Sequence, residues 1–262
     1  MGRVIAITNQ KGGVGKTTTA INLGASLAAE HCRLLVVDCD PQANTTSGFG
    51  FEKNALRPSL YEVLMQEASI EQALLTTGVE RLDLLPADRN LVGVTLELAN
   101  SSGRELRLRK VLDSIRDNYR YMLLDCPPAL DLLTVNALVA ADSMLVPIQC
   151  EYFALEGVSE LLDTMARVRE SFNSSLRIEG VLLTMYDDRT SLTRQVASDL
   201  RSFFSQDVFD TVIPRNVRLA EAPSHGKPIT LYDAQSRGAQ GYSRLAKEIL
   251  ANDEATRAIG TS

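Results

Sequence analysis

The chain has 262 residues, of which 45% are hydrophobic and 23% charged, and its formal net charge is −6. This composition is ordinary for a globular protein with a full hydrophobic core, and it argues against a disordered, fibrous or uniformly basic chain. The amino-terminal apolar run is too short for a signal peptide, and no run of about eighteen apolar residues predicts a membrane span, so we expect a cytoplasmic protein.

Short apolar runs alternate with helical patterns along the whole chain. The run at 3–8 ends at a glycine-rich loop, and residues 16–30 repeat apolar side chains at helical spacing. Further strands are predicted near 33–40, 121–128, 143–149 and 178–184, and further helices near 104–118, 155–172, 192–204 and 242–250. This order predicts a doubly wound α/β fold, with a mostly parallel sheet and helices on both faces. We expect one domain at 1–251 and a flexible tail at 252–262.

The glycine-rich loop "NQKGGVGKTT" (9–18) lies between the first strand and the first helix. Its spacing resembles a phosphate-binding loop, but Gln10 stands where a glycine is usual, and a second lysine, Lys11, precedes Gly12. Glycines at 12, 13 and 15 allow the backbone N–H groups, Val14 included, to approach an anion at the start of a helix. In this pattern Lys16 reaches the β- and γ-phosphates, and the Thr17 hydroxyl is placed to bind Mg²⁺. A plain glycine turn is the weaker interpretation.

Two aspartates follow apolar strands and support a metal site. Asp38 ends the second predicted strand, and Asp125 ends the run "YMLLD". Ligands bind beyond the carboxyl ends of strands in a doubly wound sheet, so both carboxylates are expected to face the metal of the loop. Solvated strand ends are the alternative, and two such aspartates, each after a run of apolar residues, make that alternative weaker.

Several motifs together resemble the deviant Walker A ATPases. The loop at 9–18 is joined by "VVDCDPQ" (36–42) and "LLDCPP" (123–128), while "QCEYFALEG" (149–157) and "IPRNVRLAEAPSHGKPI" (213–229) are similar to the Soj-type branch of the ParA proteins. The family also includes MinD-type site-placing ATPases and nitrogenase iron proteins. The resemblance implies a P-loop ATPase that binds ATP and Mg²⁺ and dimerises with two ATP molecules between its subunits.

The resemblance also assigns roles to single residues. It implies that Lys11 crosses to the nucleotide of the second subunit, where a cation from a partner stabilises the transferring phosphoryl group as an arginine finger does. Lys11, Lys16 and Asp40 are thus the expected catalytic residues, with Asp40 orienting the attacking water. Asp38 and Asp125 are expected to hold the water shell of Mg²⁺. The resemblance further implies that Thr18 contacts the α-phosphate and that Pro214 and Asn216 contact the adenine. It also implies that Lys11, Gly12 and Glu151 lie at the dimer interface.

Three functions within the family differ in what they require of the sequence. A MinD-like membrane-associated ATPase, the alternative that we keep, needs a basic amphipathic carboxyl-terminal helix, and the tail has no aromatic residue and no basic stripe. An iron-protein relative needs interfacial cysteines, and Cys126 fits a core position better. Residues 187–247 hold nine Lys and Arg against seven Asp and Glu, a slightly basic segment in an acidic chain.

The basic segment and the Soj-type motifs favour nonspecific binding of double-stranded DNA by the ATP-bound homodimer. The expected DNA contacts are Arg189, Arg218 and, more weakly, Lys227. We therefore predict a chromosome- or plasmid-partitioning ATPase that is associated with the nucleoid when ATP-bound and has no membrane partner. A ParB-type centromere-binding protein is the partner that the resemblance implies.

Overall fold

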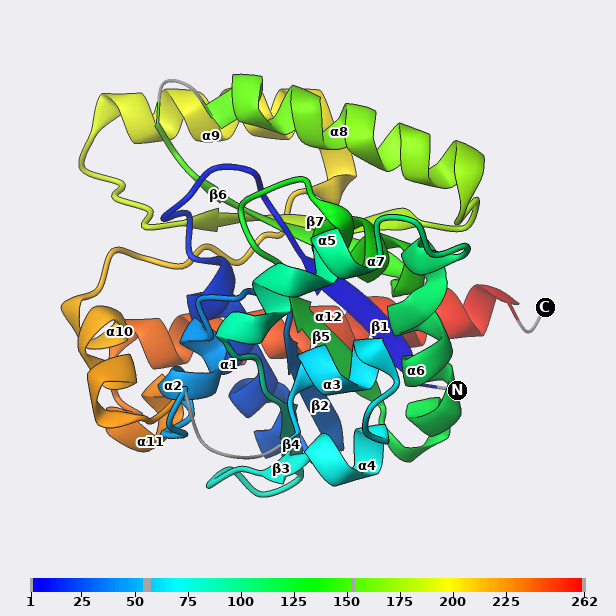
Figure 1. Ribbon diagram of the computed structural model, residues 1–262. Coiled ribbons are helices and arrows are strands. Elements are labelled where there is room, and N and C mark those ends of the chain that lie inside the picture. The colour runs from blue at the N-terminus through cyan, green and yellow to red at the C-terminus, as the bar shows by residue number, and fades with distance from the viewer. Residues whose placement is uncertain (1, 54–57, 152–153, 261–262) are drawn as a thin grey trace.

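The computed structural model describes residues 2–53, 58–151 and 154–260 (Figure 1). Its described residues include one seven-stranded sheet in the order β3-β4-β2-β5-β1-β6-β7. The pairings are parallel except between β3 and β4, which are antiparallel. The strands are β1 (Arg3–Ile7), β2 (Leu34–Asp38), β3 (Leu75–Thr76), β4 (Leu82–Leu85), β5 (Tyr121–Asp125), β6 (Ser143–Gln149) and β7 (Arg177–Thr184).

Helices connect successive strands, except β3 and β4, and cover the sheet. The α-helices are α1 (Lys16–Ala29), α2 (Asn44–Gly48), α3 (Leu60–Met65), α4 (Ile70–Ala73), α5 (Val94–Glu97), α6 (Arg107–Ile115), α7 (Leu132–Ala140), α8 (Ala154–Ser171), α9 (Ser191–Phe204), α10 (Val217–Glu221), α11 (Ile229–Tyr232) and α12 (Arg237–Gly260). Short 3₁₀ turns are η1 (Arg89–Gly93), η2 (Arg104–Leu106), η3 (Arg116–Asn118), η4 (Ser205–Asp207) and η5 (Ala222–His225).

Two apolar cores lie on opposite faces of the sheet. Alternate residues of β1 divide between them: Val4 and Ala6 join the core covered by helices α3 to α9, whereas Ile5 and Ile7 join the core under α1, α11 and α12. Side chains that alternate along a strand point to opposite faces, so a strand buried on both faces must be apolar at nearly every position. The predicted doubly wound fold class is confirmed.

The carboxyl ends of three central strands lie level with one another. Asp125 of β5 is in register with Asp38 of β2 on one side and with Ile7 of β1 on the other. The loop before α1 begins directly after β1, so its residues reach the same edge as the two aspartates. This edge is where ligands bind in doubly wound folds.

Some predicted elements differ in detail from the observed ones. The helix expected near 104–118 is divided into η2, α6 and η3. The elements that were not predicted are α2 to α5, α7, α10, α11, β3 and β4. The tail expected from residue 252 begins inside α12, which continues to Gly260, and Asp253 within it is buried. Tyr121 Oη donates to Asp253 Oδ2 at 2.9 Å, so the first part of the expected tail is held against β5. The motif at 149–157 includes residues 152 and 153, which lie outside the described residues.

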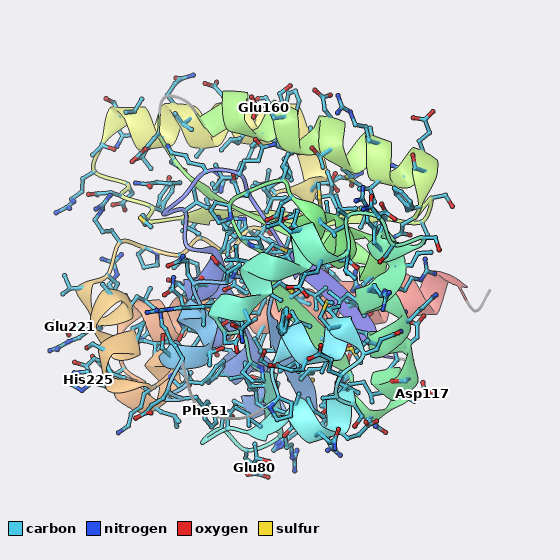
Figure 2. All side chains as sticks on the ribbon, in the orientation of Figure 1. Phe51, Glu80, Asp117, Glu160, Glu221 and His225 are labelled. Atoms are coloured by element: carbon cyan, nitrogen blue, oxygen red, sulfur yellow. The ribbon has the colours of Figure 1, made fainter. Side chains whose placement is uncertain are left out.

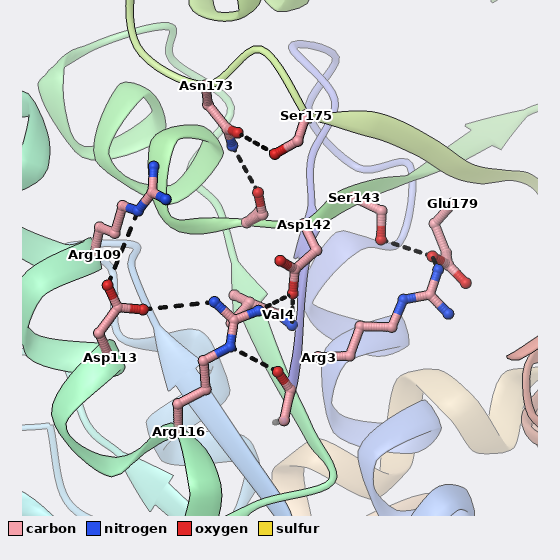
Figure 3. A network of polar contacts seen from close by, with 12 residues as sticks. Arg3, Val4, Arg109, Asp113, Arg116, Asp142, Ser143, Asn173, Ser175 and Glu179 are labelled. Atoms are coloured by element: carbon pink, nitrogen blue, oxygen red, sulfur yellow. Dashed lines mark hydrogen bonds and ion pairs between the residues drawn. The ribbon is translucent and has the colours of Figure 1, made fainter. Parts of the chain in front are cut away.

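A polar network closes the opposite, amino-terminal edge of the sheet (Figure 3). Arg116 pairs with Asp142, whose Oδ2 also accepts the N–H of Val4 at 2.8 Å. Glu179, which is almost fully buried, pairs with Arg3 and accepts the hydroxyl of Ser143 at 2.6 Å. Buried charges need such partners. These contacts fix the starts of β1, β6 and β7, and through them the register at the other edge.

Candidate functional site

The glycine loop between β1 and α1 is anchored at its start by the side chain of Asn9. Gly13 and Gly15 have φ angles of 76° and 93°, in the left-handed region that favours glycine. Asn9 Nδ2 donates to the carbonyl of Pro147 at 2.8 Å, and the N–H of Lys11 donates to Asn9 Oδ1 at 2.9 Å. A Cβ added at Gly12 or Gly13 would meet no atom within 4 Å. The space beside Gly12 and Gly13 is therefore open, so an anion can approach the backbone there.

Lys16 is the first residue of α1, and it is buried beside this loop. Its side chain is 7% exposed, and its Nζ donates to the carbonyl of Lys11 at 3.1 Å across the loop. Burial lowers the pKa of Lys16, while the nearby carboxylate of Asp125 acts in the opposite direction. A cation held out of water in this way interacts strongly with an anion that enters the loop.

Asp38 and Asp125 form a buried carboxylate pair at the strand ends. They are 0% and 1% exposed, and burial raises the pKa of both; the charge of Asp125 raises that of Asp38 further. Thr17 Oγ1 donates to Asp125 Oδ2 at 2.8 Å, so the predicted metal-binding hydroxyl and one predicted carboxylate are in contact. Two like charges out of water are costly unless a cation compensates them.

The residues present fit Mg²⁺ bound together with a nucleotide. Asp125 Oδ1 is buried and has no hydrogen-bond partner among the described residues, although it is a strong acceptor. Mg²⁺ in nucleotide sites keeps several waters and is held by one or two carboxylates together with phosphates. A hydroxyl, two carboxylates and an open phosphate loop supply that donor set.

Asp40 follows this pair and is only partly buried. Its N–H donates to Asp38 Oδ1 at 3.2 Å, and its own Oδ1 accepts the N–H of Gln42 at 2.9 Å. Asp40 also lies near enough to Lys16 and Asp125 to perturb the pKa of each. Its carboxylate is therefore part of the same site, and among the described residues its Oδ2 has no hydrogen-bond donor, which leaves this oxygen for a water molecule.

A largely apolar cavity of about 310 Å³ adjoins the loop. Thr18, Pro214 and Asn216, all predicted to contact the nucleotide, line it together with Gly15 and Tyr242. Asn216 caps α10 by accepting the N–H of Arg218 at 2.8 Å through Oδ1. The amide NH₂ of Asn216 donates to no other described residue and can bind a ligand. An apolar pocket with a few polar groups suits an aromatic base.

Lys11 is paired with Glu151 in this structure. Its Nζ lies 2.7 Å from Glu151 Oε2, and the two side chains are 38% and 47% exposed. The ammonium thus lies beside a residue that follows the end of β6. Both residues were predicted to contribute to a dimer interface, and the structure brings them together on one accessible surface of a single chain.

The predicted DNA-binding residues are exposed, and the two arginines among them are paired with acids. Arg189, whose side chain is 84% exposed, donates to both oxygens of Asp187 at 2.8 and 2.7 Å, and these bonds hold the pKa of Asp187 at about 2. Arg218 pairs with Glu221 at 2.9 Å, and Lys227 is exposed. The loop before α9, α10 and the segment before α11 lie along the left of Figure 1, where Figure 2 shows Glu221 and His225.

Several residues of the site were not predicted from the sequence. Asn9 anchors the loop, and Thr184, at the end of β7, donates to the carbonyl of Val14 at 2.8 Å. Thr45 and Thr46 of α2 donate to Asp125 and Asp38, both at 2.7 Å. Thr45 and Thr46 lie three and four residues after the motif at 36–42, and that position does not by itself predict contact with the carboxylates.

The fold and the site define a P-loop nucleotide-binding protein with an additional lysine in its loop. A family model described as "AAA domain" matches residues 2–178. The chain is 54% identical to the sporulation initiation inhibitor protein Soj of Bacillus subtilis, over 96% of this chain and 100% of that protein. It is also 54% identical to the chromosome partitioning protein ParA of Caulobacter vibrioides, over 96% and 95% of the two chains.

Among solved structures, a cobyrinic acid a,c-diamide synthase from Mycobacterium smegmatis with bound ATP analogue and magnesium superposes with a TM-score of 0.87. The two are 35% identical, over 98% of this chain and 97% of that chain. The chain belongs to the Soj/ParA family of chromosome-partitioning ATPases. Within the described residues, none of the helices is long and apolar enough to cross a membrane.

Proposed function

We propose that this partitioning ATPase is a switch in which ATP binding drives dimerisation, the dimer binds duplex DNA without sequence preference, and hydrolysis releases it. A ParB-type DNA-bound protein is the partner that we assign to it. The names of its relatives support the partitioning role.

ATP and Mg²⁺ occupy the site formed by the loop, the strand ends and the adjoining cavity. We assign the backbone of residues 12–15 and Lys16 to the phosphates, Thr17 to Mg²⁺, and Asp38 and Asp125 to its waters. Thr18 is assigned to the α-phosphate, and Pro214 and Asn216 to the base. Mg²⁺, when bound, neutralises phosphate charge. Asp40 orients the attacking water, because it is a partly exposed carboxylate beside the buried pair.

Lys11 serves the nucleotide of the second subunit. The observation that supports this role is the accessible position of its ammonium, which lies 2.7 Å from Glu151. A cation delivered by a partner stabilises charge on the transferring phosphoryl group, so hydrolysis depends on dimerisation. Gly12 and Glu151 lie on the same accessible surface and join the dimer interface.

DNA binding also depends on dimerisation in this proposal. One subunit of an acidic chain offers few cations, and each of Arg189 and Arg218 is neutralised by a neighbouring carboxylate. Two-fold symmetry doubles the number of such residues on one assembly. Phosphates then replace Asp187 and Glu221 as partners of the arginines, with the release of counterions.

The single observation that carries the proposal is the contact of Thr17 with Asp125 beside an open loop that contains both Lys11 and Lys16. The test is sedimentation velocity of the purified protein with a labelled duplex, with and without ATP and Mg²⁺. We expect dimer and DNA-bound dimer to appear together and only with ATP. The Lys16→Ala variant should remain monomeric and unbound. DNA binding by a nucleotide-free monomer at equal affinity would contradict the switch.

A further inference from the structure

Helix α2 directs two buried hydroxyls at the two buried carboxylates. Thr45 Oγ1 donates to Asp125 Oδ2 at 2.7 Å, and Thr46 Oγ1 donates to Asp38 Oδ2 at 2.7 Å. The N–H of Thr46 donates to the same oxygen of Asp38 at 2.8 Å. Thr45 is 0% and Thr46 2% exposed. Both residues are buried, and the hydroxyl of each donates to a carboxylate and not to solvent.

A strained turn brings these threonines back to the strand ends. Ala43 has φ 52° and ψ 40°, a left-handed conformation that is unfavourable for a residue with a Cβ, and its N–H donates to the carbonyl of Asp40 at 2.8 Å. The turn reverses the chain after Asp40 and places α2 against Asp38 and Asp125. Backbone strain of this kind persists where surrounding contacts over-determine it.

The hydrogen bonds restrict how each carboxylate can rotate. Thr46 Oγ1 donates its single proton to Asp38 and accepts the N–H of Ala87 at 3.0 Å. The hydroxyl is therefore fixed from both sides. Thr45 and Thr17 both donate to Oδ2 of Asp125, and this leaves Oδ1 buried without a partner among the described residues. The same arrangement keeps Oδ1 available to accept from a metal-bound water.

We propose that Thr45 and Thr46 are positioning residues that hold Asp125 and Asp38 in the orientation in which they receive hydrated Mg²⁺. They act through the carboxylates and do not touch the nucleotide. The inference rests on the proposed assignment of ATP and Mg²⁺ to this site. Residues that orient metal-binding groups typically change metal affinity by about 10–100-fold when they are removed.

The test compares Thr45→Val, which keeps the shape and loses the hydroxyl, with Thr45→Ser, which keeps the hydroxyl. Binding of N-methylanthraniloyl-ATP to the full chain is titrated with Mg²⁺, and the Mg²⁺ concentration at half-maximal effect is recorded. We expect Thr45→Val to raise it about 10-fold or more and Thr45→Ser to restore it to within about 3-fold. Thr46→Val and Thr46→Ser form the second pair and report on Asp38.

A merely structural role predicts a different result. In that case Thr45→Val lowers the unfolding temperature but leaves the Mg²⁺ midpoint of the folded protein unchanged, and this outcome overturns the inference. If Thr45→Val does not fold, Thr45→Cys, a weaker donor of similar size, should raise the midpoint, and an unchanged midpoint again overturns it. Failure of the parent protein to bind the analogue at all would instead refute the assignment of ATP to this site.

Discussion

Lys11 Nζ and Glu151 Oε2 lie 2.7 Å apart within one chain. The lysine that we assign to the partner's nucleotide therefore has a carboxylate partner of its own in the monomer. This pair must separate before Lys11 can reach across a dimer. Because both side chains are more than a third exposed, the pair is screened by water and is worth at most about 1 kcal/mol.

The first prediction concerns Glu151. Glu151→Gln removes the charge that holds Lys11 but keeps the size and hydrogen-bonding capacity of the side chain. We expect ATP-dependent dimerisation to strengthen by no more than about 5-fold, the factor that corresponds to 1 kcal/mol. Sedimentation equilibrium with a non-hydrolysable ATP analogue measures it, and Glu160→Gln on α8 is the matched control. Weaker dimerisation of Glu151→Gln would show that the carboxylate itself is needed at the interface.

A second prediction separates action within a subunit from action across the dimer. Lys11→Ala should bind ATP but hydrolyse it poorly, because the cation for each nucleotide comes from the other subunit. An equimolar mixture with Asp40→Ala should recover about a quarter of the parent rate, since half of the dimers are mixed and each has one complete site. Steady-state phosphate release gives the rates. A mixture no more active than the sum of its components would contradict transfer of Lys11 across the interface.

The third prediction separates binding from chemistry. Asp40→Ala leaves Lys16, Thr17 and the buried carboxylates in place, so it should bind ATP and dimerise. With no carboxylate to orient the water, hydrolysis should fall by at least about 100-fold, the lower range for loss of a positioned catalytic group. Size-exclusion chromatography with ATP and Mg²⁺ should show a dimer that persists for hours. Parent-like turnover would exclude Asp40 from the role.

A fourth prediction concerns the buried aspartate pair without ligands. Burial raises the pKa of Asp125 in the folded chain, so the ionised form costs stability as pH rises through that pKa. Asp125→Asn removes the charge and keeps an oxygen to accept from Thr17 and Thr45. Without nucleotide or metal, we expect it to be more stable by about 1–3 kcal/mol at pH 8, and by less at pH 5, where protonation already relieves the charge.

Urea unfolding with EDTA at the two pH values measures this gain, and Asp207→Asn, on an exposed turn, is the control. The same variant should lose the stabilisation that ATP and Mg²⁺ give the parent. Lower stability of Asp125→Asn at both pH values would contradict this prediction. It would mean that hydrogen bonds from neighbouring residues stabilise the ionised carboxylate without a cation.

The parts of the site that were predicted from sequence are those whose positions follow from the order of strand, loop and helix along the chain. A strand, a glycine loop and a helix place Lys16 and Thr17 with little help from the rest of the protein, and parallel strands bring Asp38 and Asp125 to one edge. The roles of Lys11, Asp40 and Asn216 came from resemblance and stay predictions.

The parts not predicted depend on contacts made by the folded chain. Thr45 and Thr46 reach the carboxylates only because Ala43 adopts a left-handed turn, which no residue type there signals. The pairing of Lys11 with Glu151 joins residues 140 positions apart. The two-residue strand β3 is antiparallel and owes its place to pairing with β4, since so short a segment has no periodicity to detect. Likewise, the acidic partner of Arg189 becomes evident only from side-chain geometry.

The central claim is that the ATP-bound dimer binds DNA through a basic surface, and the salt dependence of binding tests it most directly. Duplexes of two unrelated sequences are titrated with the ATP-bound protein at several salt concentrations. Each phosphate contact contributes about 0.9 to the slope of log affinity against log salt, so Arg189→Ala should lower the slope of the dimer by about 1.8. Lys110→Ala, which removes one exposed charge on α6, should leave it unchanged. Equal affinities for the two sequences and the reduced slope are the predicted result; a slope for Arg189→Ala equal to that of the parent would contradict the claim.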